Sequence, residues 1–354
     1  MQPWQSFRAR RDVYHGSAPE TPGERLDQIL AAHKLWLEKR GGARAHLARA
    51  IFSKRDLQNV DLRQAFLSNA DFAGSRLTQV DLSGADLHDA DFRGAKLVQV
   101  DFSGADLSRT NLQECWIEDV IFNESQMRQT RLFGARLLNC RMFDVHMFGC
   151  DLTAASLVGT QLSHAHLFDC HFADARFDKA SFLRAHILMC RFPGAQFNQT
   201  KMGGARIQNC DFHAVKAEAV DFSGADLRQA SLYHTSFRYS NFSESNLKGA
   251  DLSYADVSGS IFDGAILRGT DLRSTILDSA LAMNGPQLAQ ARTSETTILP
   301  SGARGPFIPG RGDERPRKKA DADRPTNPDS SHGGGRQGGG PTSLERFSTT
   351  RRKS

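Results

Sequence analysis

The sequence predicts an all-β solenoid, in which one short unit repeats along a continuous hydrophobic core. Every fifth residue from Leu47 to Leu277 is apolar, over 47 consecutive positions without an insertion or a deletion. Forty-six of these positions carry Leu, Phe, Met, Ile or Val, and Ala217 is the only small residue among them. A small side chain precedes each of them by two residues, and Arg55 alone interrupts this second column. Self-similarity at one fixed period is the sequence signature of a repeat architecture.

A period of five fits neither an α-helix nor a continuous strand. On a helix, each step of five residues turns by about 140°, which would scatter the apolar side chains around the circumference. On a strand, an odd period would send them to alternate faces. A chain that is extended for three residues and then turns a corner buries both columns on one side. The two corner positions are rich in turn residues, as in Ser83-Gly84 and Ser103-Gly104.

The repeating unit resembles that of a known family. Units such as Ala85-Asp86-Leu87 and Ala225-Asp226-Leu227 are similar to the A-(D/N)-L-x-x unit of pentapeptide repeat proteins, and the resemblance covers about residues 45–282. It implies a right-handed, four-sided (quadrilateral) β-helix with four units per coil. The chain would then form about twelve coils and, at about 4.8 Å per coil, a rod roughly 55 Å long.

A helix is expected before the repeats, where it would cover the open end of the core. The segment 24–39 has one helical stripe that carries Leu26, Ile29, Leu30, His33, Trp36 and Leu37. Thr21 to Glu24 matches a capping box with Pro22 at the first helical position, and Gly41 and Gly42 end the helix. We expect His33 to pack within this cap and not to bind a metal.

The sequence after the repeats changes character twice. Residues 285–300 are similar to a closing segment common in the family, whereas residues 301–354 are rich in Gly, Pro, Ser and charged residues. This tail has 12 Lys and Arg against 6 Asp and Glu, so the net charge of +5 belongs to it and not to the rod. We therefore expect the following segments: a flexible N-terminus (1–20), a capping helix (21–42), the β-helix (43–282), a C-terminal cap (283–302) and a disordered basic tail (303–354).

All six cysteines fall in the small inward column. The last four recur at every fourth unit and should stack on one side of the coil; the six are Cys115, Cys140, Cys150, Cys170, Cys190 and Cys210. A straight column cannot surround a tetrahedral metal, so we expect buried thiols that behave as small hydrophobes. Free core thiols, no secretory apolar segment at the start and no run of 18 apolar residues predict a cytoplasmic protein without a membrane partner.

The residue between the two inward columns points outward and reports the surface charge. Over all residues, the formal charge is −5 for 51–120, +3 for 121–220 and −3 for 221–280. The middle of the rod is therefore a basic belt between two acidic flanks.

The basic belt also carries large apolar residues at outward positions. With four units per coil, the segments 146–148, 166–168 and 186–188 lie above one another, so that their histidines form one row and their apolar third residues form a second row beside it. An exposed apolar patch with cationic neighbours is typical of a protein interface. The predicted partner-binding residues are His146, Phe148, His166, Phe168, His186, Leu188, Phe143 and Arg141. The alternative is that the aromatic rings only stack and stabilise the coil.

No catalytic motif accompanies this pattern. The sequence has no Gly-rich phosphate loop, no nucleophile elbow and no cysteine pair at metal-binding spacing. The many aspartates are explained as outward positions of the repeat, and a filled coil lacks the concave pocket in which catalytic groups are desolvated. We expect no enzymatic activity, no cofactor, no metal and no small-molecule substrate.

Three kinds of function stay open at this stage. The first is a protein-binding rod whose partner is unidentified, with a homodimer as one form. The second follows from the resemblance, because some pentapeptide repeat proteins imitate duplex DNA, bind DNA gyrase and confer quinolone resistance. The third, also from resemblance, is a bacterial secreted effector or secretion-associated factor. Direct nucleic-acid binding is expected only weakly, through the basic tail.

The basic belt argues against imitation of DNA, which would require an acidic surface throughout. We therefore expect the purified protein not to inhibit supercoiling by DNA gyrase at submicromolar concentration. A supercoiling assay at two salt concentrations checks this, because electrostatic inhibition weakens as salt rises. Potent, salt-sensitive inhibition would favour the gyrase alternative.

Overall fold

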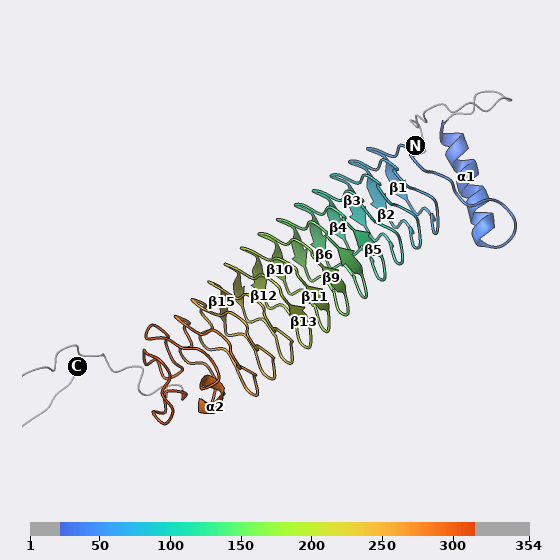
Figure 1. The fold of residues 1–354 in the computed structure, drawn as a ribbon. Coiled ribbons are helices and arrows are strands. Elements are labelled where there is room, and N and C mark those ends of the chain that lie inside the picture. The colour runs from blue at the N-terminus through green and yellow to red at the C-terminus, as the bar shows by residue number, and fades with distance from the viewer. Residues whose placement is uncertain (1–21, 316–354) are drawn as a thin grey trace, which may run out of the picture. The chain divides into compact units, whose positions relative to one another are not determined.

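The computed structural model describes residues 22–315, which form a parallel β-solenoid with a helix at its N-terminal end (Figure 1). The helix α1 spans Pro22–Leu37, and a short helix α2 spans Gly285–Leu288 near the other end. The predicted fold class is confirmed. Thr21 of the predicted capping box, the N-terminal segment 1–20 and most of the predicted tail lie outside the described residues.

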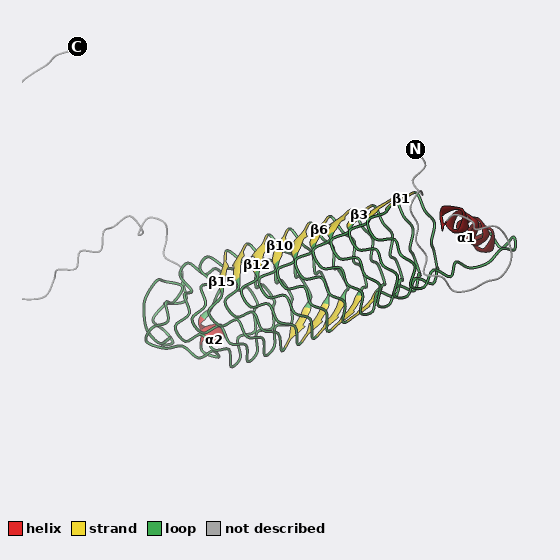
Figure 2. Cartoon of the chain, turned by 90° about the horizontal axis from the view of Figure 1, so that it is seen from above, coloured by secondary structure: helices red, strands yellow, loops and turns green. Residues whose placement is uncertain are grey.

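Three-residue strands build two parallel sheets. The larger sheet has ten strands in the order β1 (Asp56–Gln58), β2 (Arg76–Thr78), β3 (Lys96–Val98), β4 (Trp116–Glu118), β6 (Arg136–Leu138), β8 (Ser156–Val158), β10 (Arg176–Asp178), β12 (Gln196–Asn198), β14 (Lys216–Glu218) and β15 (Ser236–Arg238). The smaller sheet contains β5 (Gln126–Arg128), β7 (His146–Phe148), β9 (His166–Phe168), β11 (His186–Leu188) and β13 (Arg206–Gln208). Figure 2 shows the strands of the two sheets along opposite sides of the coil.

The register between neighbouring strands is the same in both sheets, and each residue pairs with the one four units further along the chain. In the larger sheet Arg76 pairs with Lys96, and in the smaller sheet His146 pairs with His166. Isolated bridges with the same offset, such as Asp61 to Asp81 and Asp71 to Asp91, form the two remaining sides. Each coil therefore has four sides of one unit each, as the resemblance implied.

The corner of each unit requires a left-handed backbone at one position. Every such corner residue has a positive φ, for example 54° at Asn59, 62° at Gly84 and 56° at Tyr239. Gly, Asn and Asp adopt this conformation at low cost, which explains their frequency at the corners. Larger residues at this position must be held there by the hydrogen bonds of the neighbouring coils.

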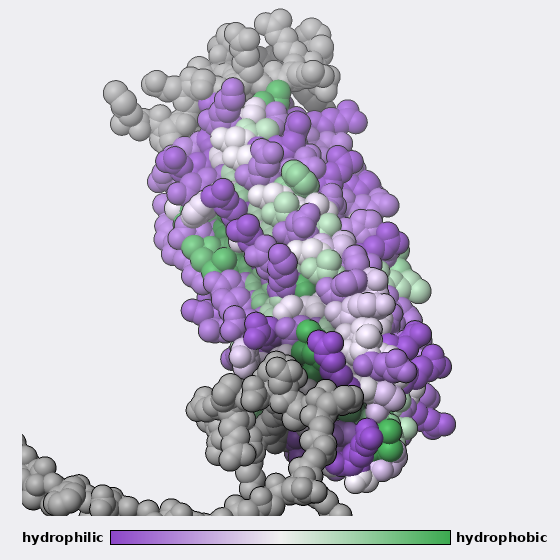
Figure 3. All heavy atoms as spheres, turned by 90° about the vertical axis from the view of Figure 1, so that its left-hand side faces the viewer, coloured by the Kyte–Doolittle hydropathy of each residue, from purple (hydrophilic) through white to green (hydrophobic). Residues whose placement is uncertain are grey.

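The two predicted columns form the core. Their side chains are buried along the whole rod, and Phe rings stack in consecutive coils. The rings of Phe172 and Phe192 lie 4.7 Å apart at an interplanar angle of 3°, and Phe192 stacks in the same way on Phe212. Figure 3 shows the result from outside, where hydrophilic residues cover most of the visible face and hydrophobic ones form small groups.

The helix α1 closes the N-terminal end through His33, which is fully buried. The backbone N–H of Ala45 donates to His33 Nδ1 over 3.1 Å, so Nε2 carries the proton and donates to the carbonyl of Arg63 over 3.0 Å. Burial lowers the pKa of His33, in agreement with this neutral form. Gly42 lets the chain leave the helix, because a Cβ there would lie 2.1 Å from the carbonyl oxygen of Ala32. The prediction that His33 packs within the cap is confirmed.

The C-terminal cap satisfies the last carbonyls of the core. Gln287, in a capping box with Asn284, donates from Nε2 to the carbonyls of Phe262 and Ala265 over 2.8 and 2.9 Å. The ordered cap extends past residue 302, because Phe307 packs on the core and residues up to 315 are described. The sequence placed this part in the tail, since Phe307 is isolated among Gly, Pro and charged residues.

We expect Phe172→Asp to destabilise the rod by about 4 kcal/mol or more, because it places a charge and a void inside the Phe column. Denaturant unfolding followed by circular dichroism measures the change. Gln196→Asp, which adds the same charge at an exposed position, should alter the free energy of unfolding by less than about 0.5 kcal/mol. Equal unfolding curves for Phe172→Asp and the wild type would contradict the assigned core.

Candidate interaction surface

The smaller sheet places the predicted histidine and apolar residues in two adjacent rows. Its strands β7, β9 and β11 pair in register, so the first and third residues of each strand point outward in line. The rings of His146 and His166 lie 4.9 Å apart at 5°, and those of Phe148 and Phe168 lie 5.2 Å apart at 5°. The predicted alignment of these rows is confirmed.

The two phenylalanines are the most exposed apolar members of the predicted rows. Phe148 is 47% exposed and Phe168 is 38% exposed. His186 and Leu188 continue the rows but are half-buried, and the ring of His186 turns by 68° relative to that of His166. The rows line a shallow depression of about 260 Å³ that also includes Gln126 and Arg128. We call His146, Phe148, His166, Phe168, His186 and Leu188 the histidine–phenylalanine patch.

Arg141 and Phe143 do not belong to this patch. They lie on the preceding side of the coil, and the corner at Asp144, with a φ of 52°, separates them from His146. The backbone N–H of Phe143 donates to Oδ1 of Asn123 on that side. Their prediction as patch residues is therefore wrong: they are close to the histidines in sequence, but one corner in this fold changes the side.

Sequence reasoning missed two features of this surface. Met189 is 51% exposed and directly follows Leu188, so it extends the apolar row at the corner. The sequence feature that could have identified Met189 is an apolar residue at a corner position, which is usually polar. Arg128 in β5 and Arg206 in β13 occupy the two ends of the rows, which becomes evident only when the five strands are aligned.

The aspartates of the two flanks are partly neutralised by the repeat itself. Asp61, Asp91, Asp226 and Asp271 each accept the backbone N–H two residues later and pair with the arginine at that same position. The hydrogen bonds from Arg273 lower the pKa of Asp271. Several carboxylates of the acidic flanks are therefore not free for a partner.

The charged side chains of the basic belt, in contrast to several of those in the flanks, are not paired within residues 22–315. Residues 121–220 contain 11 Lys and Arg, and none of them forms an ion pair with any residue in the described part of the chain. Within the patch, burial lowers the pKa of His186, and the nearby His166, Arg206 and His164 lower it further. The belt therefore carries free cations, and beside the apolar row His186 resists protonation.

The cysteines lie in the core, as predicted. All six are free and buried, and Cys150 Sγ donates to the carbonyl of Met127 over 2.9 Å. Burial raises the pKa of Cys115 and of Cys140 to about 12, so neither thiol forms a thiolate near neutral pH. These side chains fill space and offer no nucleophile to the surface.

One cluster of residues of types that can bind a metal ion occurs elsewhere among residues 22–315. Asp86, His88 and Asp106 have ligand atoms within 4.8 Å of one another on one side of the rod. The sequence analysis did not predict this group. Its side chains are partly or fully exposed, and His88 contacts Asp86 directly. No helix among the described residues has the length and apolar content to cross a membrane.

Comparisons with known proteins agree with the fold. The family model for the pentapeptide repeat region matches residues 45–122 and 165–241, and the one for pentapeptide repeats (8 copies) matches 146–182 and 240–278. Together they cover more than half of the chain. No curated protein sequence matches significantly.

Several solved structures are similar. HetL, a pentapeptide repeat protein involved in heterocyst differentiation regulation from Nostoc sp. strain PCC 7120, is 24% identical, with 71% of this chain and 94% of HetL covered and a TM-score of 0.36. A form of QnrB1, a plasmid-mediated fluoroquinolone resistance protein, is 18% identical, with 63% of this chain and 87% of the QnrB1 chain covered and a TM-score of 0.30. A thylakoid-lumen pentapeptide repeat protein from Arabidopsis thaliana is 25% identical, with 34% of this chain and 69% of the Arabidopsis chain covered and a TM-score of 0.16.

Proposed function

Because the chain belongs to the pentapeptide repeat family, we propose that its rod is a non-enzymatic scaffold that binds a protein partner through the histidine–phenylalanine patch. The observation that carries this proposal is the exposure of Phe148 and Phe168, stacked on a flat sheet with Met189 at the end of the row. Contiguous exposed apolar groups mark interaction sites.

The surroundings of the apolar row fit the anatomy of an interface. Aromatic residues and arginines are enriched at the centres of interfaces, and a polar rim surrounds them. Here the phenylalanine row is the apolar centre, and the histidine row with Arg128 and Arg206 is the rim. Neither arginine forms an ion pair with a described residue, so positive charge added to the patch is not compensated within the rod.

The other two functions are less well supported. A DNA-mimic modulator of gyrase needs free carboxylates along its length, whereas arginines pair with several aspartates of the flanks and the middle is basic. The secreted effector or secretion-associated factor rests on family resemblance alone. Self-association remains one form of the proposed activity, with a second copy as the partner.

We expect the double variant Phe148→Ser/Phe168→Ser to lose partner binding or self-association while it keeps its fold. Anchors of this kind contribute about 2 kcal/mol each, and neither side chain belongs to the inward columns. A pull-down with mass spectrometry and the mass from light scattering measure the two forms of binding.

The matched control is Phe133→Ser/Tyr254→Ser, which removes two rings that are 42% and 55% exposed outside the patch. This control should behave as wild type. If the phenylalanine variant retains the wild-type partners and mass, the rings only stabilise the coil.

Binding through the patch should weaken as the pH falls below about 6. Histidine side chains in water titrate near pH 6.5, and burial lowers the pKa of His186 further, so the patch has least charge at neutral pH. Protonation then adds positive charge beside Arg128 and Arg206 and desolvation of the patch becomes costlier. Binding measured from pH 8 to 5 checks the sign. His186→Gln should flatten the profile, and an unchanged pH dependence in that variant would contradict this role of the patch.

A further inference from the structure

The larger sheet carries a row of cations that runs along one side of the rod. The first residue of each strand points outward, and these residues are Asp56, Arg76, Lys96, Trp116, Arg136, Ser156, Arg176, Gln196, Lys216 and Ser236. After Asp56, the row contains five basic residues and no acidic one. We call Arg76, Lys96, Arg136, Arg176 and Lys216 the cation row; all five are exposed.

The cation row distinguishes this side from the other three. The corresponding rows on the other sides have aspartates in the N-terminal coils, such as Asp61 and Asp81, Asp71 and Asp91, or Asp86 and Asp106. Here Arg76 and Lys96 stand at those levels instead. Among residues 22–315, no member of the cation row has an ion-pair partner.

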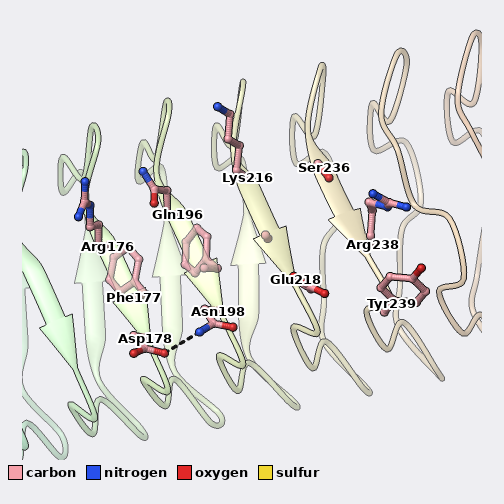
Figure 4. A pocket seen from close by; sticks show the side chains of 12 residues that line it. Arg176, Phe177, Asp178, Gln196, Asn198, Lys216, Glu218, Ser236, Arg238 and Tyr239 are labelled. Atoms are coloured by element: carbon pink, nitrogen blue, oxygen red, sulfur yellow. Dashed lines mark hydrogen bonds between the residues drawn. The ribbon is translucent and has the colours of Figure 1, made fainter.

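The C-terminal half of this side is hollowed into an open groove of about 640 Å³. Figure 4 shows Arg176, Gln196 and Lys216 along one edge and Asp178 and Glu218 along the other. Asn198 stands between these two acids and donates from Nδ2 to Asp178 Oδ1 over 2.8 Å. Asp178 is therefore engaged, while Arg176 and Lys216 keep their donors free at the groove edge.

We propose that the cation row is a second binding surface, opposite the histidine–phenylalanine patch, for an acidic polypeptide segment in helical form. Charge complementarity requires an anionic partner, since five cations without an ion-pair partner among the described residues lie on one side. Trp116 lies within the same row, 40% exposed, with the Lys96 ammonium 6.0 Å from its ring. It offers an aromatic contact between Lys96 and Arg136.

The spacing of the row indicates a helix. Lys96, Arg136, Arg176 and Lys216 occupy alternate strands, so they recur about every 9.6 Å at the usual interstrand distance. Two turns of an α-helix advance about 10.8 Å, a mismatch that long Arg and Lys side chains absorb. Side chains on one face of an extended segment recur at about 6.7 Å, so they no longer match the cation spacing of about 9.6 Å after a single step.

The same spacing disfavours a nucleic-acid strand. Phosphates follow one another at about 3.4 Å of helix rise per strand, far more densely than these cations. Three carboxylates, at Glu118, Asp178 and Glu218, share this side with the row and would repel a continuous polyanion. A helix with one carboxylate every two turns presents no charge opposite them.

The test uses the full-length protein and a synthetic helical peptide of about 24 residues, without Trp, that carries Glu at every seventh position. Binding is followed by the intrinsic fluorescence of Trp116, obtained by subtracting the signal of Trp116→Phe from that of the wild type. This signal reports occupation of the row beside Trp116. A peptide of the same composition with scrambled Glu positions and a short oligothymidylate are the comparison probes.

The informative variant is Arg136→Ser/Arg176→Ser, which places in the row the residue already present at Ser156 and Ser236. Its control, Arg191→Ser/Lys201→Ser, removes two cations of the same belt from the two sides formed by isolated bridges. We expect about a fivefold loss of peptide affinity in the first variant and less than twofold in the second, with unchanged melting temperatures.

The comparison probes separate the remaining explanations. The scrambled peptide should bind several times more weakly than the peptide with aligned Glu. No response of Trp116, or equal losses in the two variants, would show that the row has no specific role. Tighter binding of the oligothymidylate than of the peptide would assign the surface to nucleic acid and overturn the proposal.

Discussion

The backbone hydrogen bonds between successive coils are the constraint on which the rest of this structure depends. They hold each residue of a strand next to the one four units later, in parallel and without a shift along the rod. A one-residue slip would turn the core columns toward solvent, so the core enforces the register. The stacking of Phe172 on Phe192, the histidine row and the cation row all follow from this single offset.

The same geometry explains why ion pairs form between charged side chains in the flanks of the rod and, within residues 22–315, not in its middle. In the flanks, an outward aspartate is followed by a backbone N–H and often an arginine two residues later, as in Asp91 and Arg93, so the charge is used within the unit. In the middle, basic residues replace the aspartates at the outward position and have no such partner among the described residues. Their free donors belong to the surface, where a partner can use them.

The two proposed surfaces use opposite sides of one rigid coil in different ways. The histidine–phenylalanine patch offers apolar area with a weakly charged rim, which suits a compact protein anchor. The cation row offers regularly spaced charge with one exposed tryptophan, which suits an elongated acidic segment. Because neither surface requires the coil to change shape, both can be occupied at once, and the rod would then hold two partners at a set separation.

The sequence by itself determined the period, the inward columns, the turn positions and the packing of His33, because each depends on residues within a few positions or on burial alone. The number of units per coil came from the family resemblance, and from it the alignment of His146 with His166. Only the tertiary structure decided which side each residue faces: the corner at Asp144 removes Arg141 and Phe143 from the patch, and Met189 lies at its edge. The cation row was hidden for the same reason. Charge summed along the chain mixes four sides, whereas interstrand hydrogen bonds bring Arg136 and Arg176, two coils apart, onto one.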